Sequence, residues 1–405
     1  MSDDTSAPRA RYGWIRPGWF LAGFLGGAVA LAALGWKLSR TDYHPGFERF
    51  YAAISPETNY FPTLDEMKSI VRARCRKDQV LVVVGGNSVL LGVWQPRHEI
   101  WTLRLQELLG PGYCVVDFAF SGASPTDGGA VLAESLRKEY PRQIYIADEA
   151  PLTGVASWGA EVYRYLFWQA YFSGQLLPDA VRDGRVKEFR EADPANARLL
   201  EETRISLLFN AALHYRDLWN WVTFRHFSTV ARYPGEVFPT LLRSRAGYPD
   251  AEGDATDPQI VAQRYPASVL DIELRIVRGA DLFYHSRDAS GRWVLAEATR
   301  GDVARRSATA FPDSLKKRTL MLFGHSSPYY RRMLTPDEAA RENQSFLDTV
   351  ELWRASGYPA MQFGRDFTDD DYGDRIHLSK LGGAKLAAAV APEVRELAAR
   401  LGYLR

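Results

Sequence analysis

Short apolar runs, each followed by a segment with helical periodicity, constrain the fold of this chain more than any other sequence feature. The run at residues 80–86, VLVVVGG, is aliphatic throughout before its two glycines, which is typical of a strand buried on both faces. A helix, a strand, a helix and a strand are then expected in turn, at 100–110, 113–120, 130–140 and 143–147. This alternation predicts βαβ units and a parallel sheet covered by helices.

The alternation lapses between residues 151 and 315 and then resumes. Two segments of this stretch, 158–177 and 197–227, have helical spacing and are rich in aromatic residues. The later pattern predicts two more strands and two more helices, at 319–324, 360–363, 335–355 and from about Ser379. We therefore predict one doubly wound, flavodoxin-like α/β domain built from residues 78–150 and 316–405, interrupted by an aromatic-rich helical insertion at 151–315.

The N-terminal part contains a charge-free stretch from Trp19 to Trp36 that is about long enough to cross a hydrocarbon core as a helix. Indole rings at both ends suit the two membrane interfaces. The sequence thus predicts a short tail at 1–18, one transmembrane anchor at 19–38 and a helical lead-in at 39–77.

A cleaved signal peptide is the alternative to the anchor. Ala30-Leu31-Ala32 has the small-x-small form of a cleavage site, although it falls inside the apolar run instead of after it. Basic residues occur on both sides of the run, so charge does not determine its orientation.

The charge balance and the cysteine content exclude several classes of function. The 50 basic and 49 acidic residues nearly balance, which excludes a strongly nucleic-acid-seeking protein, and we expect no nucleic-acid partner. Cys75 and Cys114 lie in no CxxC or Cys/His cluster, so neither a metal nor a disulfide scaffold is expected. A pair of buried, inert thiols is favoured over a single disulfide, which an oxidising compartment would allow.

Gly85-Gly86-Asn87-Ser88 follows the first predicted strand at its carboxyl end, which is where the binding sites of open α/β sheets lie. The glycines permit the tight turn and close backbone approach that a serine nucleophile needs. The same four residues are also ordinary turn composition.

A second group of polar residues, Asp374 and His377 in DRIHLS, precedes the last predicted helix. A serine hydroxyl is a poor nucleophile until a neutral imidazole accepts its proton, and the imidazolium then needs an oriented carboxylate. Asp-x-x-His supplies both groups from one loop. We therefore expect Asp374 and His377 to act on Ser88.

A buried strand ending in GxxS, a second strand followed by Gly122, and a terminal DxxHL motif occur in this order. In these features the chain resembles the SGNH (GDSL-type) hydrolase superfamily. The resemblance implies that Ser88 is the nucleophile and that Asp374 and His377 complete a catalytic triad. It also implies an oxyanion hole formed by the backbone N–H groups of Ser88 and Gly122, and a reaction that needs no metal or organic cofactor.

The resemblance covers about residues 78–148 and 316–400, and the chain departs from the family pattern at two positions. Asn87 stands where GDSL sequences have an acidic residue, and that residue does not move a proton. Asp148 follows the third strand where the family has an asparagine that donates to the oxyanion. Loss of one such donor can lower the rate by about 10²–10³, so this site is expected to be slow, or inactive.

The anchor, the altered third block and the closing DRIHLSKLGGAKLA make the chain similar to the DltD-type branch. Its members are membrane-anchored and work beside a membrane-bound O-acyltransferase in modifying cell-envelope polymers. The similarity implies a single-pass protein of the cytoplasmic (inner) membrane with its catalytic domain on the periplasmic side. The implied function is a serine O-acyltransferase or esterase that moves an acyl group, with acetyl expected, on an envelope glycan or related polymer. A catalytically inactive assembly subunit is the alternative.

Several other residues have a simple structural role as the alternative to a functional one. His325 follows the strand at 319–324 and would lie at the carboxyl edge of the sheet, so it and Asn87 are candidates for substrate binding, although a hydrogen bond to a nearby loop is the simpler role for His325. The aromatic residues of the insertion are expected in the core. Trp168 and Trp219 are the positions expected to contact a membrane partner.

Overall fold

A single parallel sheet forms the centre of the molecule. The computed structural model describes residues 17–41, 47–50, 62–96, 99–120, 122–149, 163–176, 184, 186–187, 191, 211–222 and 285–403. The five strands lie in the order β2-β1-β3-β6-β7 and all pairs are parallel. Their bounds are β1 (Val80–Val84), β2 (Tyr113–Asp117), β3 (Gln143–Asp148), β6 (Thr319–Gly324) and β7 (Ala360–Phe363). The order reverses direction at β1 and β3, as in doubly wound folds, so the predicted parallel α/β sheet is confirmed.

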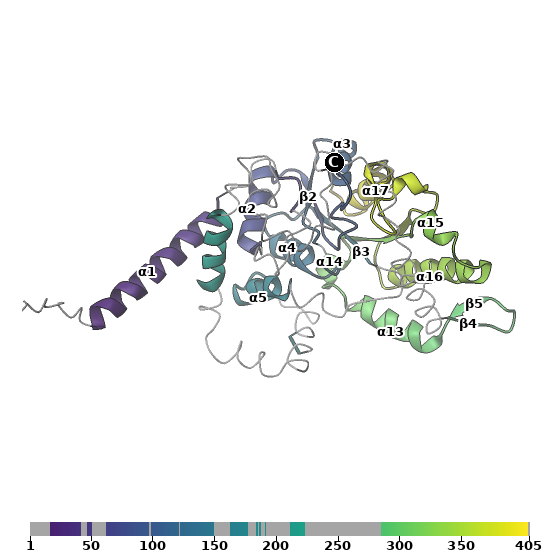
Figure 1. Ribbon diagram of the computed structural model, residues 1–405, viewed down its shortest axis with the longest axis horizontal. Helices are drawn as coiled ribbons and strands as arrows, with labels where there is room; N and C mark the ends of the chain where they lie inside the picture. Colours follow the sequence, from purple (N-terminus) through teal and green to yellow (C-terminus); the bar gives the residue numbers. More distant parts are fainter. Residues whose placement is uncertain are drawn as a thin grey trace, which may run out of the picture.

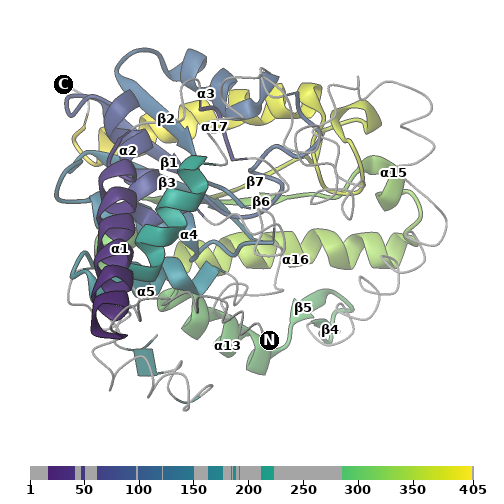
Figure 2. The same ribbon diagram turned by 60° about the vertical axis from the view of Figure 1, so that its left-hand side comes forward.

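Helices cover both faces of this sheet (Figures 1 and 2). One face carries α3 (Trp101–Leu109) and α17 (Lys380–Arg400), which share an apolar cluster with Val80, Val82 and Val84 of β1. The other face carries α2 (Leu64–Arg74), α4 (Gly128–Leu136), α5 (Arg164–Phe172) and α16 (Pro336–Ala355). These helices share a second apolar cluster with Leu81 and Val83 of β1. Alternate residues of β1 thus face different helices, which explains the unbroken apolar run in its sequence.

The later elements follow the predicted pattern closely. Strands β6 and β7 have the predicted bounds, and α16 begins after the predicted Thr335. The hydroxyl of Thr335 accepts the backbone N–H of Glu338, whose carboxylate accepts the backbone N–H of Thr335, a reciprocal cap that fixes the start of the helix. The remaining short helices are α14 (Asp313–Lys316) and α15 (Pro328–Arg331).

Two expectations about local structure were wrong. Residues 47–50 are not helical; instead the rings of Phe47 and Phe50 pack against Phe118 in the core. The insertion, expected to be helical, contains an antiparallel hairpin formed by β4 (His285–Arg287) and β5 (Trp293–Leu295) next to α13 (Glu297–Ala308).

The hairpin has a local cause. The Asp288 carboxylate accepts the backbone N–H groups of Ser290 and Arg292, and Gly291 supplies the positive φ of 80° that the turn needs. Residues 151–162 and 223–284 of the insertion lie outside the described residues.

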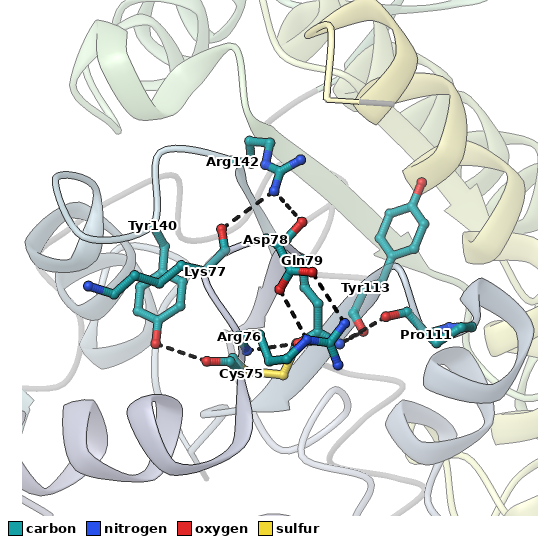
Figure 3. A network of polar contacts seen from close by, with 10 residues as sticks. Cys75, Arg76, Lys77, Asp78, Gln79, Pro111, Tyr113, Tyr140 and Arg142 are labelled. Atoms are coloured by element: carbon teal, nitrogen blue, oxygen red, sulfur yellow. Dashed lines mark hydrogen bonds and ion pairs between the residues drawn. A yellow bond between two sulfur atoms is a disulfide. The ribbon is translucent and has the colours of Figure 1, made fainter. Parts of the chain in front are cut away.

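Cys75 and Cys114 form a disulfide, contrary to the expected pair of free thiols. The bond joins the end of α2 to β2, and the polar contacts around it are drawn in Figure 3. Gln79 donates to the carbonyls of Pro111 and Tyr113, so the chain entering β1 is also held to β2 by hydrogen bonds. The sequence separation of 39 residues gave no sign of this, because only the parallel pairing of β1 with β2 brings the two cysteines together.

Helix α1 (Pro17–Leu38) is long and apolar enough to cross a membrane, and its side chains are mostly exposed. Its C-terminal half packs on the helix at 211–222, which lies beside it in both views (Figures 1 and 2). A Cβ at Gly35 would lie 1.8 Å from the carbonyl oxygen of His214, so glycine is required at this helix crossing.

The two tryptophans expected to contact a partner differ in exposure. Trp219 is 53% exposed on the helix at 211–222, whereas Trp168 is 4% exposed and stacks on Phe172 inside the core. Trp168 therefore belongs to the packed interior, as expected for most aromatic residues of the insertion, and was the wrong choice for a surface contact.

Candidate active site

The turn after β1 carries Ser88 and is shaped by its neighbours. Gly86 has a φ of +94°, and a Cβ there would lie 2.2 Å from Oδ1 of Asp148, so only glycine fits. The backbone N–H of Asn87 donates to the same Oδ1 at 3.1 Å, and the side-chain oxygen of Asn87 accepts the backbone N–H of Val89 at 2.8 Å. The turn therefore holds Ser88 at the carboxyl end of β1, half-buried.

Ser88, His377 and Asp374 form a continuous hydrogen-bonded chain although 289 residues separate Ser88 from His377. Ser88 Oγ lies 2.7 Å from Nε2 of His377, and Nδ1 of His377 lies 2.6 Å from Oδ2 of Asp374. An ionised carboxylate only accepts hydrogen bonds, so Nδ1 carries the proton and Nε2 is left to accept the Ser88 hydroxyl proton. The structure thus brings together the three residues that the sequence analysis selected.

Asp374 is held as a carboxylate by its surroundings. Burial favours its neutral form, but the adjacent charge of His377 and several hydrogen bonds outweigh burial and hold the pKa of Asp374 well below its usual range. Its Oδ1 accepts the backbone N–H groups of Ile376 and His377 at 3.0 and 2.8 Å. The carboxylate is therefore fixed by its own loop before it contacts the imidazole.

That loop is closed tightly on itself. The backbone N–H of Gly373 donates to the carbonyl of His377 at 2.8 Å, and Tyr372 pairs with Leu378 in an isolated antiparallel bridge. The Ser379 hydroxyl then caps α17. Asp374 and His377 thus lie on a short hairpin-like loop whose ends are fixed.

Trp94 is a residue of this site that the sequence analysis missed. Its indole Nε1–H donates to Oδ2 of Asp374 at 2.8 Å, the same oxygen that accepts from His377. Trp94 has a φ of +72°, the sole positive value at a non-glycine residue in the part of the chain that the structure describes. For a bulky side chain this conformation is unfavourable, and such strain is concentrated at functional sites.

Neighbouring residues hold Trp94 in that conformation. A Cβ at Gly373 would lie 2.4 Å from the Trp94 ring, so the indole packs directly on the backbone of the Asp374 loop. Arg49 is buried beneath the loop after Ser88 and donates to the carbonyls of Leu91, Gly92 and Gln95. Neither residue lies in a recognisable motif, and only the pair of glycines at 92 and 373 hints at close packing.

The expected oxyanion-hole residues lie at the same edge of the sheet. The backbone N–H of Phe120 donates to the carbonyl of Gly86 at 3.0 Å, which ties the chain after β2 to the turn before Ser88. Gly122 is exposed, with a φ of +72°. Within the described residues, the backbone N–H groups of Ser88 and Gly122 donate to no other protein group. Both donors thus remain available to a ligand.

Asp148, at the position where the resemblance predicts an asparagine donor, lies beneath the turn that carries Ser88. Its side chain is buried, with the residue 4% exposed, and its carboxyl oxygen supports the Asn87 N–H beneath the turn. Burial raises the pKa of Asp148 to about 7, even though hydrogen bonds from Asn87 favour the charged form. Asp117, at the end of β2, is also buried and its pKa is raised to about 7. At neutral pH a large fraction of each carboxyl group is therefore uncharged.

The two candidates for substrate binding have other contacts. Asn87 uses its side-chain oxygen to cap the turn. His325 is 3% exposed; its Nε2 lies 2.9 Å from the Gln362 side-chain oxygen, and its ring stacks on Phe346 with centroids 3.7 Å apart. His325 lines a cavity whose lining includes none of the three residues of the hydrogen-bonded chain.

A scan against protein-family models and a search of curated proteins return no match to this chain. The resemblance drawn from its motifs therefore remains a prediction. No group of three or more His, Cys, Asp or Glu side chains suited to a metal ion occurs among the described residues.

Proposed function

We propose that this chain is a membrane-anchored serine O-acyltransferase or esterase of SGNH type, acting on an acyl group of a cell-envelope glycan or related polymer. The observation that carries the proposal is the hydrogen-bonded chain from Ser88 Oγ through His377 to Asp374. A nucleophile within reach of a base that is itself oriented by a carboxylate is the arrangement that acyl transfer requires.

In the first step Ser88 Oγ attacks the ester carbonyl carbon, and its proton passes to Nε2 of His377. The imidazolium formed is stabilised by the Asp374 carboxylate. The tetrahedral intermediate carries its negative charge on the former carbonyl oxygen, within reach of the N–H groups of Ser88 and Gly122. When the intermediate collapses, the carbon–oxygen bond to the departing alcohol breaks and His377 returns the proton to that alcohol, leaving an acyl-serine.

In the second step a water or a sugar hydroxyl attacks the acyl-serine carbonyl, again losing its proton to His377. Collapse breaks the bond to Ser88 Oγ, and the proton returns to that oxygen. Water gives hydrolysis and a sugar hydroxyl gives transfer. Both routes return the enzyme to its starting state with no cofactor.

The raised pKa of Asp148 makes this chemistry feasible although a second carboxyl group lies beside the serine turn. A charged carboxylate next to the nucleophile turn would oppose an oxyanion, but a carboxyl group with a pKa of about 7 is largely neutral at mildly acidic pH. The family asparagine is still missing as a donor. We therefore expect two backbone donors, and slow turnover of simple esters.

The proposed location outside the cytoplasm rests on two features. Helix α1 is apolar enough to span a membrane, and Cys75 and Cys114 form a disulfide, which persists in oxidising compartments such as the periplasm. A tethered enzyme gains effective concentration toward a membrane partner, so a polytopic acyl donor protein fits better than a free ester substrate. The exposed Trp219 beside α1 is the proposed contact residue.

Labelling with a fluorophosphonate probe tests the proposal directly. The full-length chain in detergent is the right sample, because α1 packs on the helix at 211–222 and its removal would uncover that surface. We expect labelling that disappears in Ser88→Ala and persists in Ser124→Ala, whose serine lies in the loop before α4. Absence of labelling in folded wild-type protein would favour an inactive assembly subunit.

A second measurement separates transferase from esterase. Acyl release from a small acetyl ester should be slow with water alone and faster when an oligosaccharide acceptor is added, because a positioned acceptor compensates for weak oxyanion stabilisation. Fast hydrolysis that ignores the acceptor would identify an esterase.

A further inference from the structure

A cavity of about 320 Å³ lies next to the loop that carries Asp374 and His377. It is formed by the turn after β6, α15, the first half of α16 and Arg365, two residues after β7. Two hydrogen bonds join its wall to the loop: the backbone N–H of Ser327 donates to the carbonyl of Arg375 at 2.8 Å, and the Tyr372 hydroxyl donates to the carbonyl of His325 at 2.9 Å. The volume is near the lower end for small-ligand sites, roughly 300–1,000 Å³.

The cavity lining is basic. Arg331, Arg332 and Arg365 contribute three positive charges against one negative charge from Glu342. Arg332 is engaged, with its guanidinium 2.6 Å from Asp369. Among the described residues neither Arg331 nor Arg365 forms an ion pair with a carboxylate, so the lining keeps a net positive charge.

Arg331 is oriented by the backbone instead of by an acid. Its terminal nitrogens donate to the carbonyls of Gly364 and Arg365 at 3.3–3.4 Å. Its Nε is buried and has no hydrogen-bond partner in the described chain. A buried guanidinium N–H without an acceptor is unfavourable, and a ligand oxygen would remove that penalty.

His325, another polar residue of the wall, is neutral. Burial, together with the nearby charges of Arg331 and Arg365, lowers the pKa of His325 to about 4, although its hydrogen bond to Gln362 acts in the opposite direction. The imidazole therefore adds no positive charge that would repel the arginines.

We propose that this cavity binds an oxyanion, a carboxylate or phosphate, carried by the polymer whose neighbouring unit reaches Ser88. The inference rests on the proposed function for its biological substrate, while the cavity and its charge stand without it. Arginine is suited to the task because its planar fork matches both groups. The enzyme would thus act on an acidic polymer, with the cavity fixing the register of the chain relative to the nucleophile.

The test is binding of short oligosaccharides to the full-length chain with Ser88→Ala, which prevents turnover, measured by calorimetry in detergent. Trigalacturonate supplies carboxylates, a glycerol phosphate trimer supplies phosphates, and galactotriose is the neutral control. We expect one acidic trimer to bind at least tenfold more tightly than galactotriose. The better of the two identifies the chemical group.

Charge variants assign the binding to the cavity. Arg365→Gln and Arg331→Gln should each weaken binding of the acidic trimer about tenfold, as expected for loss of a charge-assisted hydrogen bond. Arg104→Gln on α3 removes an equal charge from an exposed surface pair and should leave affinity unchanged. Because Arg331 also supports backbone carbonyls, the exposed Arg365 is the decisive position if Arg331→Gln fails to fold.

Equal affinity for acidic and neutral trimers, or binding that survives Arg365→Gln, would overturn the inference. Fluorophosphonate labelling of Ser88 in the wild-type protein tests the proposed function separately, because the probe is small and reports only on the reactivity of the serine. Binding without any labelling would reject the proposed function and keep the anion site. Labelling without selective binding would reject the anion site and keep the proposed function.

Discussion

Asp374 and Asp148 are both buried beside the same serine turn, yet their surroundings affect them in opposite ways. The charge of His377 and the hydrogen bonds to Asp374 overcome burial, so its pKa falls well below the usual range. Asp148 has fewer donors, burial dominates, and its pKa rises to about 7. The comparison shows that burial alone does not determine a carboxylate's role; the number of donors and the nearest cation do.

The largest effect is expected when the charge of Asp374 is removed. Asp374→Asn keeps the shape but replaces an acceptor oxygen with an amide, so His377 loses the partner that fixes its tautomer. The rate of fluorophosphonate labelling should fall about 10³–10⁴-fold while the circular dichroism spectrum stays the same. Asp369→Asn, in the neighbouring surface pair, is the matched control and should retain the wild-type rate. Retained labelling in Asp374→Asn would remove Asp374 from the proposed mechanism.

The raised pKa of Asp148 should make the free energy of unfolding depend on pH. Its folded-state pKa is raised above the unfolded value, so the folded protein holds a proton that the unfolded chain releases between about pH 4 and 7. The contribution of this group is full below pH 4 and is lost as pH rises through 7. Asp148→Asn should therefore lose less unfolding free energy than wild type between pH 5 and 8, by up to a few kcal/mol.

Urea unfolding at both pH values measures this difference. Asp117 is shifted in the same direction mainly by burial, which both proteins share, while the smaller part of its shift that comes from the Asp148 charge is absent in the variant. If the two proteins lost the same free energy between pH 5 and 8, Asp148 would already be ionised in the folded state.

Trp94 tests why the two carboxyl groups differ, because its indole N–H donates to Asp374 and not to Asp148. Trp94→Phe keeps an aromatic ring against Gly373 but removes the N–H, and labelling of Ser88 should slow about tenfold from loss of one charge-assisted hydrogen bond. Trp219→Phe, on the exposed helix at 211–222, should label at the wild-type rate. An unchanged rate in Trp94→Phe would mean that the loop backbone and His377 orient Asp374 without help.

The smallest expected effect is on the alkaline side of the activity profile. As pH rises through about 7, Asp148 ionises next to the nucleophile turn and opposes the negative charge that develops on the substrate oxygen. Wild-type ester turnover should then decline a few-fold relative to Asp148→Asn between pH 7 and 9. Profiles that superimpose after scaling would show that the carboxyl group is too well shielded to affect the oxyanion.

Much of the fold and three residues of the candidate site could be predicted from local patterns. The buried strands, the caps at Thr335 and Ser379, and the Ser88 and DxxH motifs each depend on residues close in sequence. Trp94, Arg49 and the disulfide could not be found in this way, because their partners lie 280, 42–46 and 39 residues away. Neither hydrophobic periodicity nor a short motif predicts contacts between residues so far apart in the sequence.

The sequence by itself determined the elements and their order, since apolar alternation, glycine positions and helix caps act over a few residues at a time. It also determined which side chains have the chemistry for acyl transfer. Tertiary structure alone decided which groups those side chains meet. Packing placed Trp94 on Gly373 and against the carboxylate of Asp374, and it buried Asp148 beneath Asn87. The charge state of each acid follows from that placement, because desolvation and hydrogen bonding depend on neighbours that only the folded chain brings within a few ångströms.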